Sequence, residues 1–286
     1  LPTNTCNDIA FSPNGKSVVA GHVTSPWLSA YPWSSSGFGT KFSHPTTLPT
    51  GTGNDVAFSP AGDAIAVAHT TSPFISVYPW SGSGFGTKFS DPSTLPAGTG
   101  NKVAFSPAGD AIAIGHATSP FISVYAWSGS GFGSKFSNPA SLPASAGTQV
   151  KFSPDGNSIV TASWDHTAIV YNLKTKTSQR IQHSGSVRSA QFSPDGNSVV
   201  TASNDGATII YNLKTGESHK TQHSDLVNSA QFSPDSNSIV TALSDGTAIV
   251  YNLKTKESHK IQHLSGVNSA QFSPDGNSVI TASNDR

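Results

Sequence analysis

The sequence contains no methionine, one cysteine (Cys6) and few charged residues, only 11% of the total. A single cysteine excludes an internal disulfide but points to no particular compartment. The longest apolar runs, such as residues 64–68, have the length of a strand and fall far short of the roughly 20 residues that cross a membrane as a helix. Acidic and basic residues balance at 16 each, so charge favours neither nucleic acid nor membrane insertion.

The sequence begins at Leu1 instead of methionine, which we interpret as processing or trimming of a longer product. Ser, Thr, Asn, Gly and Pro take the place of the missing charged residues. These residues favour turns and polar sheet faces over long helices, so the composition predicts an all-β fold.

A repeat is the dominant feature of the sequence. The tripeptide Phe-Ser-Pro recurs with its Phe at positions 11, 58, 105, 152, 192, 232 and 272, at intervals of 47 residues and then of 40. Seven such units indicate seven stacked supersecondary elements, because one unit alone cannot bury its apolar face.

Within the fifth unit, period-two patterns and turn residues predict four antiparallel strands, at residues 189–192, 198–203, 208–212 and 218–222. Four strands in about 40 residues are typical of a β-propeller blade. We therefore expect a single β-propeller over 1–286, with three 47-residue blades in 1–150, and three 40-residue blades plus an inner hairpin of a seventh in 151–286. The outer strands of blade seven could lie beyond Arg286 or come from another chain, or the ring could close imperfectly.

Blades five to seven carry a His before the first strand, which blade four lacks. Blades four, five and seven end the second strand in a Ser, blades four to seven have an Asp in the next turn, and blades four to six have a Tyr in the third strand. In these features the chain resembles the WD-repeat family, with Tyr-Asn in place of Trp-Asp. The resemblance implies a structural hydrogen-bond relay in each blade, in which an Asp fixes the tautomer of a buried imidazole. Its members would be His183, Ser203, Asp205 and Tyr211 in blade five, His223, Asp245 and Tyr251 in blade six, where Leu243 replaces the Ser, and His263, Ser283 and Asp285 in blade seven.

Blades one to three form a second subtype. Each ends its second strand in a His (His22, His69, His116), continues with a Ser-Pro turn and ends its third strand in a Trp (Trp33, Trp80, Trp127). This subtype resembles repeats of bacterial surface proteins and phage virion proteins, which favours a surface or extracellular location. The abrupt change of subtype has two interpretations: natural divergence by local duplication, or recombination or engineered fusion of two half-propellers.

No motif in the sequence predicts catalysis, a cofactor or a metal site. The repeated histidines fall on separate blades, too far apart for one metal ion. The Ser, His and Asp sets recur in several blades, whereas a catalytic triad is normally single. We therefore expect a protein that is not an enzyme.

Two binding functions remain open. The first is a non-catalytic protein–protein interaction scaffold, such as a component of a surface or virion assembly. By family analogy its partner would contact Trp164, Arg188, Asn204, Leu226, Asn228, Ser244 and Asn268, with Trp164 as the main anchor. The second is a carbohydrate-binding propeller that uses the repeated Trp residues, although these rings would equally well cover the contacts between blades. A recombined propeller with no ligand of its own is a third possibility.

Overall fold

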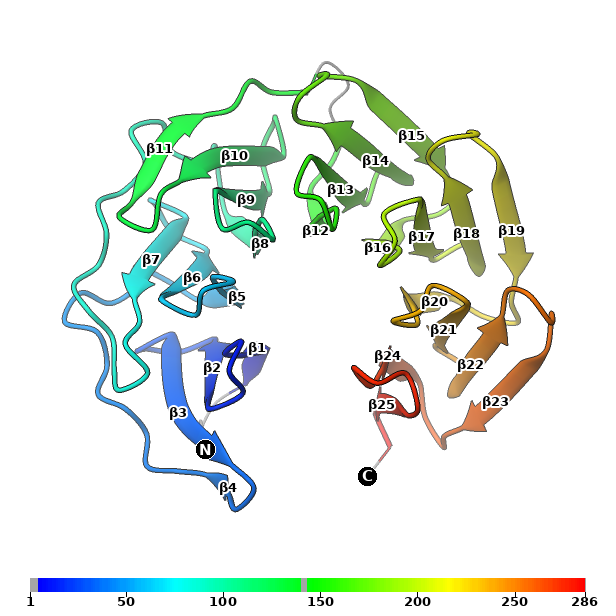
Figure 1. The fold of residues 1–286 in the computed structure, drawn as a ribbon, viewed down its shortest axis with the longest axis horizontal. Coiled ribbons are helices and arrows are strands. Elements are labelled where there is room, and N and C mark those ends of the chain that lie inside the picture. The colour runs from blue at the N-terminus through cyan, green and yellow to red at the C-terminus, as the bar shows by residue number, and fades with distance from the viewer. Residues whose placement is uncertain (1–4, 140–142, 286) are drawn as a thin grey trace. The chain divides into compact units, whose positions relative to one another are not determined.

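A computed structural model describes residues 5–139 and 143–285. Every regular element there is a β-strand, and the strands form seven antiparallel sheets (Figure 1). The expected all-β propeller is confirmed, with consecutive strands adjacent in every sheet. The second sheet has three strands, and an isolated bridge between Trp80 and Phe85 stands where most blades have a fourth strand.

The chain divides into two compact units, residues 1–138 with 145–150, and residues 139–144 with 151–286. Blades one to three comprise β1 (Cys6–Phe11), β2 (Ser17–His22), β3 (Leu28–Ser34) and β4 (Gly37–Phe38); β5 (Gly53–Phe58), β6 (Ala64–His69) and β7 (Ile75–Pro79); and β8 (Gly100–Phe105), β9 (Ala111–His116), β10 (Ile122–Trp127) and β11 (Phe132–Lys135).

The later sheets have shorter connections. They comprise β12 (Gly147–Phe152), β13 (Ser158–Ser163), β14 (Thr167–Asn172) and β15 (Ser178–Gln182); β16 (Val187–Phe192), β17 (Ser198–Ser203), β18 (Ala207–Asn212) and β19 (Ser218–Gln222); β20 (Val227–Phe232), β21 (Ser238–Leu243), β22 (Thr247–Asn252) and β23 (Ser258–Gln262); and the hairpin β24 (Val267–Phe272) and β25 (Val279–Ser283).

The Phe-Ser-Pro repeat marks the turn from the first strand of a blade to the second. In this turn Ser59 Oγ accepts a hydrogen bond from the N–H of Ala64 at 2.9 Å and donates to Asp63 at 2.7 Å. Gly62 supplies the positive φ, 72°, that the turn requires. The serine is therefore repeated because it closes the turn.

The apolar core lies between successive sheets of each unit. In the first unit, Val19 and Leu28 of blade one pack with Ile65, Val67 and the fully buried Tyr78 of blade two. Clusters of the same kind join blades two and three, four and five, and five and six. Because each sheet needs its neighbour to bury its faces, the blades within a unit stabilise one another.

The inner strands that start blades one, two, three, five, six and seven carry an irregularity at the same place. The register to the second strand shifts between Gly53 and Asp55, for example, and between Val227 and Ser229. This shift is a β-bulge, so one residue per blade is unpaired and its side chain is redirected. The residues skipped are Asn7, Asn54, Asn101, Arg188, Asn228 and Asn268.

The bulge brings neighbouring inner strands into hydrogen-bond contact. Asn54 donates to the carbonyl of Gly100 in the next blade at 2.8 Å, and Asp55 accepts the N–H of Val103 at 2.8 Å. In the second unit, Ser189 Oγ accepts the N–H of Ala230 at 3.1 Å. We call these contacts inner-strand stitches.

We predict that Ser189→Ala destabilises the protein. The substitution leaves the buried N–H of Ala230 without its acceptor, which costs about 1–3 kcal/mol. Ser218→Ala, on the exposed strand β19, is the matched control and should leave the free energy of unfolding nearly unchanged. Urea denaturation checks both, and equal stability of the two variants would contradict a stabilising role for the stitch.

Candidate functional site

The histidines of blades one and two each form a local pair of hydrogen bonds, and His116 of blade three makes one of the two, from Nε2 to Ser123 Oγ at 3.1 Å. His69 Nδ1 lies 2.8 Å from the carbonyl oxygen of Thr71, and Nε2 lies 3.0 Å from Ser76 Oγ. A carbonyl can only accept, so Nδ1 carries the proton and the Ser76 hydroxyl donates to Nε2. Burial lowers the pKa of His69 to about 4, and the bond to Thr71 opposes this only in part, so the ring is neutral. His22 has the same two partners in its own blade, Thr24 and Ser29.

Blade five uses a different pair. His183 Nδ1 donates to the carboxylate of Asp205, with distances of 3.1 and 3.2 Å to its two oxygens. Burial lowers the pKa of His183 despite this neighbour. Burial alone would raise the pKa of Asp205, but the N–H groups of Ser184 and Ala207 donate to its carboxylate and hold its pKa well below the usual range. The imidazole is thus neutral and the carboxylate charged.

The hydroxyl on the far side of the ring belongs to another residue than we expected. Thr201 Oγ1, and not Ser203, lies 2.8 Å from His183 Nε2. Ser203 donates instead to the carbonyl of Gly185 at 3.0 Å, and Tyr211 packs in the apolar cluster between blades four and five. In blade seven, His263 contacts Asp285 at 3.2 Å and Thr281 at 2.8 Å. Ser283 there bonds the carbonyl of Ser265 at 2.8 Å.

Blade six departs from this arrangement. His223 Nε2 lies 3.0 Å from Thr208 of the preceding blade, while Asp245 accepts from Ser224 at 2.5 Å. The buried Leu243 cannot make the bond that Ser203 makes to the loop before its own inner strand. The bond from His223 to Thr208, which joins two blades, therefore replaces the expected contact between His223 and Asp245. Tyr251, the other expected member of the relay, packs in the apolar cluster between blades five and six.

The polar candidates for partner binding occupy two positions that recur in the second unit: the bulge of an inner strand and the turn after the second strand. The structure brings these positions together. Arg188 Nε donates to Asn204 Oδ1 at 2.7 Å, and Asn228 Nδ2 donates to Ser244 Oγ at 3.1 Å. Asn268 makes the same contact with Asn284 at 2.7 Å.

These pairs differ in whether the bulge residue also bonds the next blade. Asn228 also donates to the carbonyl of Val267 at 2.9 Å, so it forms an inner-strand stitch. Arg188 is exposed and contacts its own blade. Of the two, Arg188 is better placed to meet a partner.

Three large apolar side chains lie exposed beside these pairs. Trp164 keeps 61% of its surface exposed in the turn after β13, and Ser186 of the next blade donates to its carbonyl at 3.4 Å. Leu226 is 36% exposed in the loop before β20. Leu264, in the equivalent loop of blade seven, is 97% exposed and was not among the expected residues.

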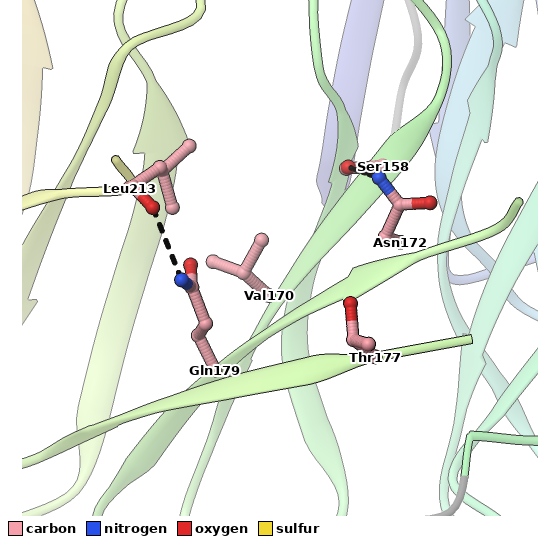
Figure 2. A pocket seen from close by; sticks show the side chains of 6 residues that line it. All are labelled: Ser158, Val170, Asn172, Thr177, Gln179 and Leu213. Atoms are coloured by element: carbon pink, nitrogen blue, oxygen red, sulfur yellow. Dashed lines mark hydrogen bonds between the residues drawn. The ribbon is translucent and has the colours of Figure 1, made fainter. Parts of the chain in front are cut away.

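A small pocket opens elsewhere in the second unit, between β13, β14 and β15 and the turn that follows β18 (Figure 2). Its volume is about 200 Å³, below the range of about 300–1,000 Å³ typical of small-molecule sites. Gln179 spans it, because its amide donates to the carbonyl of Leu213 at 3.1 Å (Figure 2). The pocket is better explained as a gap between blades than as a binding site.

Within 5–139 and 143–285, no three His, Cys, Asp or Glu side chains are grouped so that they could hold a metal ion. In the same residues, no helix has the length and apolarity that a membrane span requires.

Comparison with known proteins matches the model of one family, described as the NUP159/214 beta propeller, to residues 129–284, more than half of the chain. The chain belongs to this family. No curated protein matches it.

In this NUP159/214 beta propeller, two of the repeated Trp side chains of the first unit, Trp80 and Trp127, belong to the core. Trp80 is 5% exposed and meets the rings of Phe42, Phe58 and Phe85 edge to face, with centroids 5.0–6.1 Å apart. Trp127 is surrounded in the same way. Their faces are therefore covered by phenylalanine and are not platforms for a sugar.

The hydroxyl partners of the buried histidines were not predicted, although the repeat marks their positions. A Thr stands at the position of Thr201 and Thr281 in every 40-residue blade, and a Ser recurs at 47-residue intervals as Ser29, Ser76 and Ser123. A repeat interval that keeps a polar residue inside an apolar strand marks a buried hydrogen bond.

We predict a loss of stability as the pH falls from about 6.5 to 4. In that interval His69 is protonated in the unfolded chain but stays neutral in the folded chain, because burial lowers the pKa of His69 to about 4 in the folded state. Each such imidazole contributes up to about 1.4 kcal/mol per pH unit. His69→Gln should flatten the pH dependence of the free energy of unfolding, measured by urea denaturation.

The matched control is His259→Gln, which removes an exposed histidine from β23 and should preserve the pH dependence. If His69→Gln kept the wild-type pH dependence, burial of the imidazole would not be its source.

Proposed function

We propose that the chain is a non-catalytic protein–protein interaction scaffold whose partner docks on the turns around Trp164. Propellers of this family type commonly serve as protein-interaction scaffolds, and this supports the broader proposal. We further propose that blades four to seven are WD repeats and that the scaffold serves a larger surface or virion assembly. The proposal includes no catalytic step and no cofactor.

The observation that carries the proposal is the exposure of Trp164, 61% of its surface, in a turn with no core to fill. Tryptophan and arginine dominate the energetics of protein interfaces, and Arg188 lies in the neighbouring inner strand. The bond from Arg188 to Asn204 holds the guanidinium in place, which reduces the entropy lost on binding. Leu226 and Leu264 add exposed apolar side chains in the loops before β20 and β24.

A carbohydrate site on Trp33, Trp80 and Trp127 has less support. Trp80 and Trp127 are buried by phenylalanine rings, and Trp33 packs on Phe11 and Phe38. The proposal therefore places the partner on the second unit.

We predict that Trp164→Ala lowers the affinity for the protein partner at least tenfold, as expected when a hot-spot tryptophan is lost. Immobilised wild-type protein should retain one stoichiometric partner from an extract of its source, and titration of that partner measures the affinity. Because Trp164 is exposed, the melting temperature should change little.

Leu95→Ala is the matched control, since it removes an apolar side chain that is 40% exposed in the first unit. This variant should bind as the wild type does. Undiminished binding by Trp164→Ala would remove the basis of the proposal.

A further inference from the structure

The turn between the first two strands of blade one contains the single Asn-Gly pair of the sequence, Asn14-Gly15. Both residues are exposed, and no atom lies within 4 Å of the place that a Cβ on Gly15 would occupy. An asparagine that precedes glycine is chemically labile, because glycine has no side chain to keep its backbone nitrogen away from the side-chain carbonyl of the asparagine. The turn therefore places a reactive pair at the surface.

The reaction open to this pair is deamidation. The backbone nitrogen of Gly15 loses its proton and attacks Cγ of Asn14, the new C–N bond closes a cyclic imide, and the side-chain amide leaves as ammonia. Water then opens the imide at either of its carbonyls, which gives aspartate or isoaspartate, in which the backbone runs through the side chain. The sum is asparagine and water to either acid and ammonia, so no oxidant or reductant is needed.

The closed turn holds both reacting groups in hydrogen bonds. The N–H of Gly15 donates to the carbonyl of Ser12 at 2.8 Å, which keeps the proton on the nitrogen that must attack. Asn14 Oδ1 accepts the Ser12 hydroxyl at 2.8 Å and the N–H of Lys16 at 3.0 Å, which fixes the orientation of the side chain. The reaction therefore requires the turn to open first.

An aspartate already occupies the equivalent position in each blade of the second unit. These residues are Asp155, Asp195, Asp235 and Asp275. Asp155 Oδ1 accepts the hydroxyl of Ser153 at 2.6 Å and the N–H of Asn157 at 3.0 Å, as Asn14 Oδ1 does with its own neighbours. At Asp235 the hydroxyl of the turn serine and a backbone N–H lower the pKa of the carboxyl to about 2. The turn thus accommodates an ionised aspartate at the position of Asn14.

We propose that Asn14 is a deamidation site controlled by opening of its turn, protected in the folded blade and converted when the turn opens. The aspartate product can close the turn again with the bonds that blade four makes. The isoaspartate product cannot, because it adds a backbone atom inside the loop that Ser12 Oγ closes by accepting the N–H of Ser17 at 2.9 Å. This proposal does not rest on the proposed scaffold function.

The test follows the mass of the peptide that contains residue 14 while the full chain is kept in a mildly alkaline buffer. Exchange of the side-chain NH₂ for OH raises this mass, and chromatography separates the aspartate and isoaspartate forms. We expect conversion in the folded chain to be at least about tenfold slower than in the same chain unfolded by urea. Equal rates in the two states would overturn the proposal.

Ser12→Ala removes the hydroxyl that holds the turn and should speed conversion at Asn14 in the folded chain about two- to tenfold. The matched control is Ser153→Ala, which removes the equivalent hydroxyl from blade four and should leave the rate at Asn14 unchanged. If Ser12→Ala reacted at the wild-type rate, or if both variants were accelerated equally, the local turn would not control the reaction.

Two substitutions of Asn14 complete the test. Asn14→Ala introduces the residue that blades two and three have at this position, Ala61 and Ala108, and should abolish the gain in mass. Asn14→Asp should unfold at the wild-type temperature or above it, measured by circular dichroism. A gain in mass that persists in Asn14→Ala, or a clear loss of stability in Asn14→Asp, would contradict the proposal.

Discussion

A backbone N–H of one inner strand bonds to a side chain of the preceding blade, and this bond recurs within both units. It requires a β-bulge that redirects one residue, and a short acceptor next to that bulge. Asp55 supplies the acceptor for Val103, and Ser189 supplies it for Ala230. In these two pairs the bond links the inner strand of one blade to that of the next, beside the buried middle strands.

The two repeat subtypes meet the same structural needs with different chemistry. A buried imidazole bonds a carbonyl and a serine in the first unit, as at His69, whereas His183 bonds a carboxylate and a threonine in the second. Blade seven repeats the second arrangement at His263, whereas the His223 ring of blade six bonds Thr208 of the preceding blade. The same need of a buried imidazole, a partner for its ring nitrogens, is therefore met by different groups in the two units.

Much of this molecule was predictable from the repeat. The strands of the fifth blade lie within two residues of their expected limits, and His183 meets Asp205 as the family resemblance implied. The partner of the second ring nitrogen was not predictable, because Thr201 and Ser203 are two residues apart on one strand and share a face. The sequence showed that Leu243 interrupts the hydrogen-bond relay of blade six. It did not show that the His223 ring bonds Thr208 instead, because Thr208 belongs to the neighbouring blade.

The spacing of Phe-Ser-Pro and the period-two pattern were enough to establish the blade, its strands and its turns, since these depend on local sequence. Which surface residues remain available to a partner was decided by packing between blades. Arg188 and Asn228 hold the same place in the repeat, yet Asn228 reaches the carbonyl of Val267 in the next blade while Arg188 bonds Asn204 of its own blade. The reason is physical: the role of a bulge residue depends on an atom about 40 residues away, which becomes its neighbour only when the blades stack.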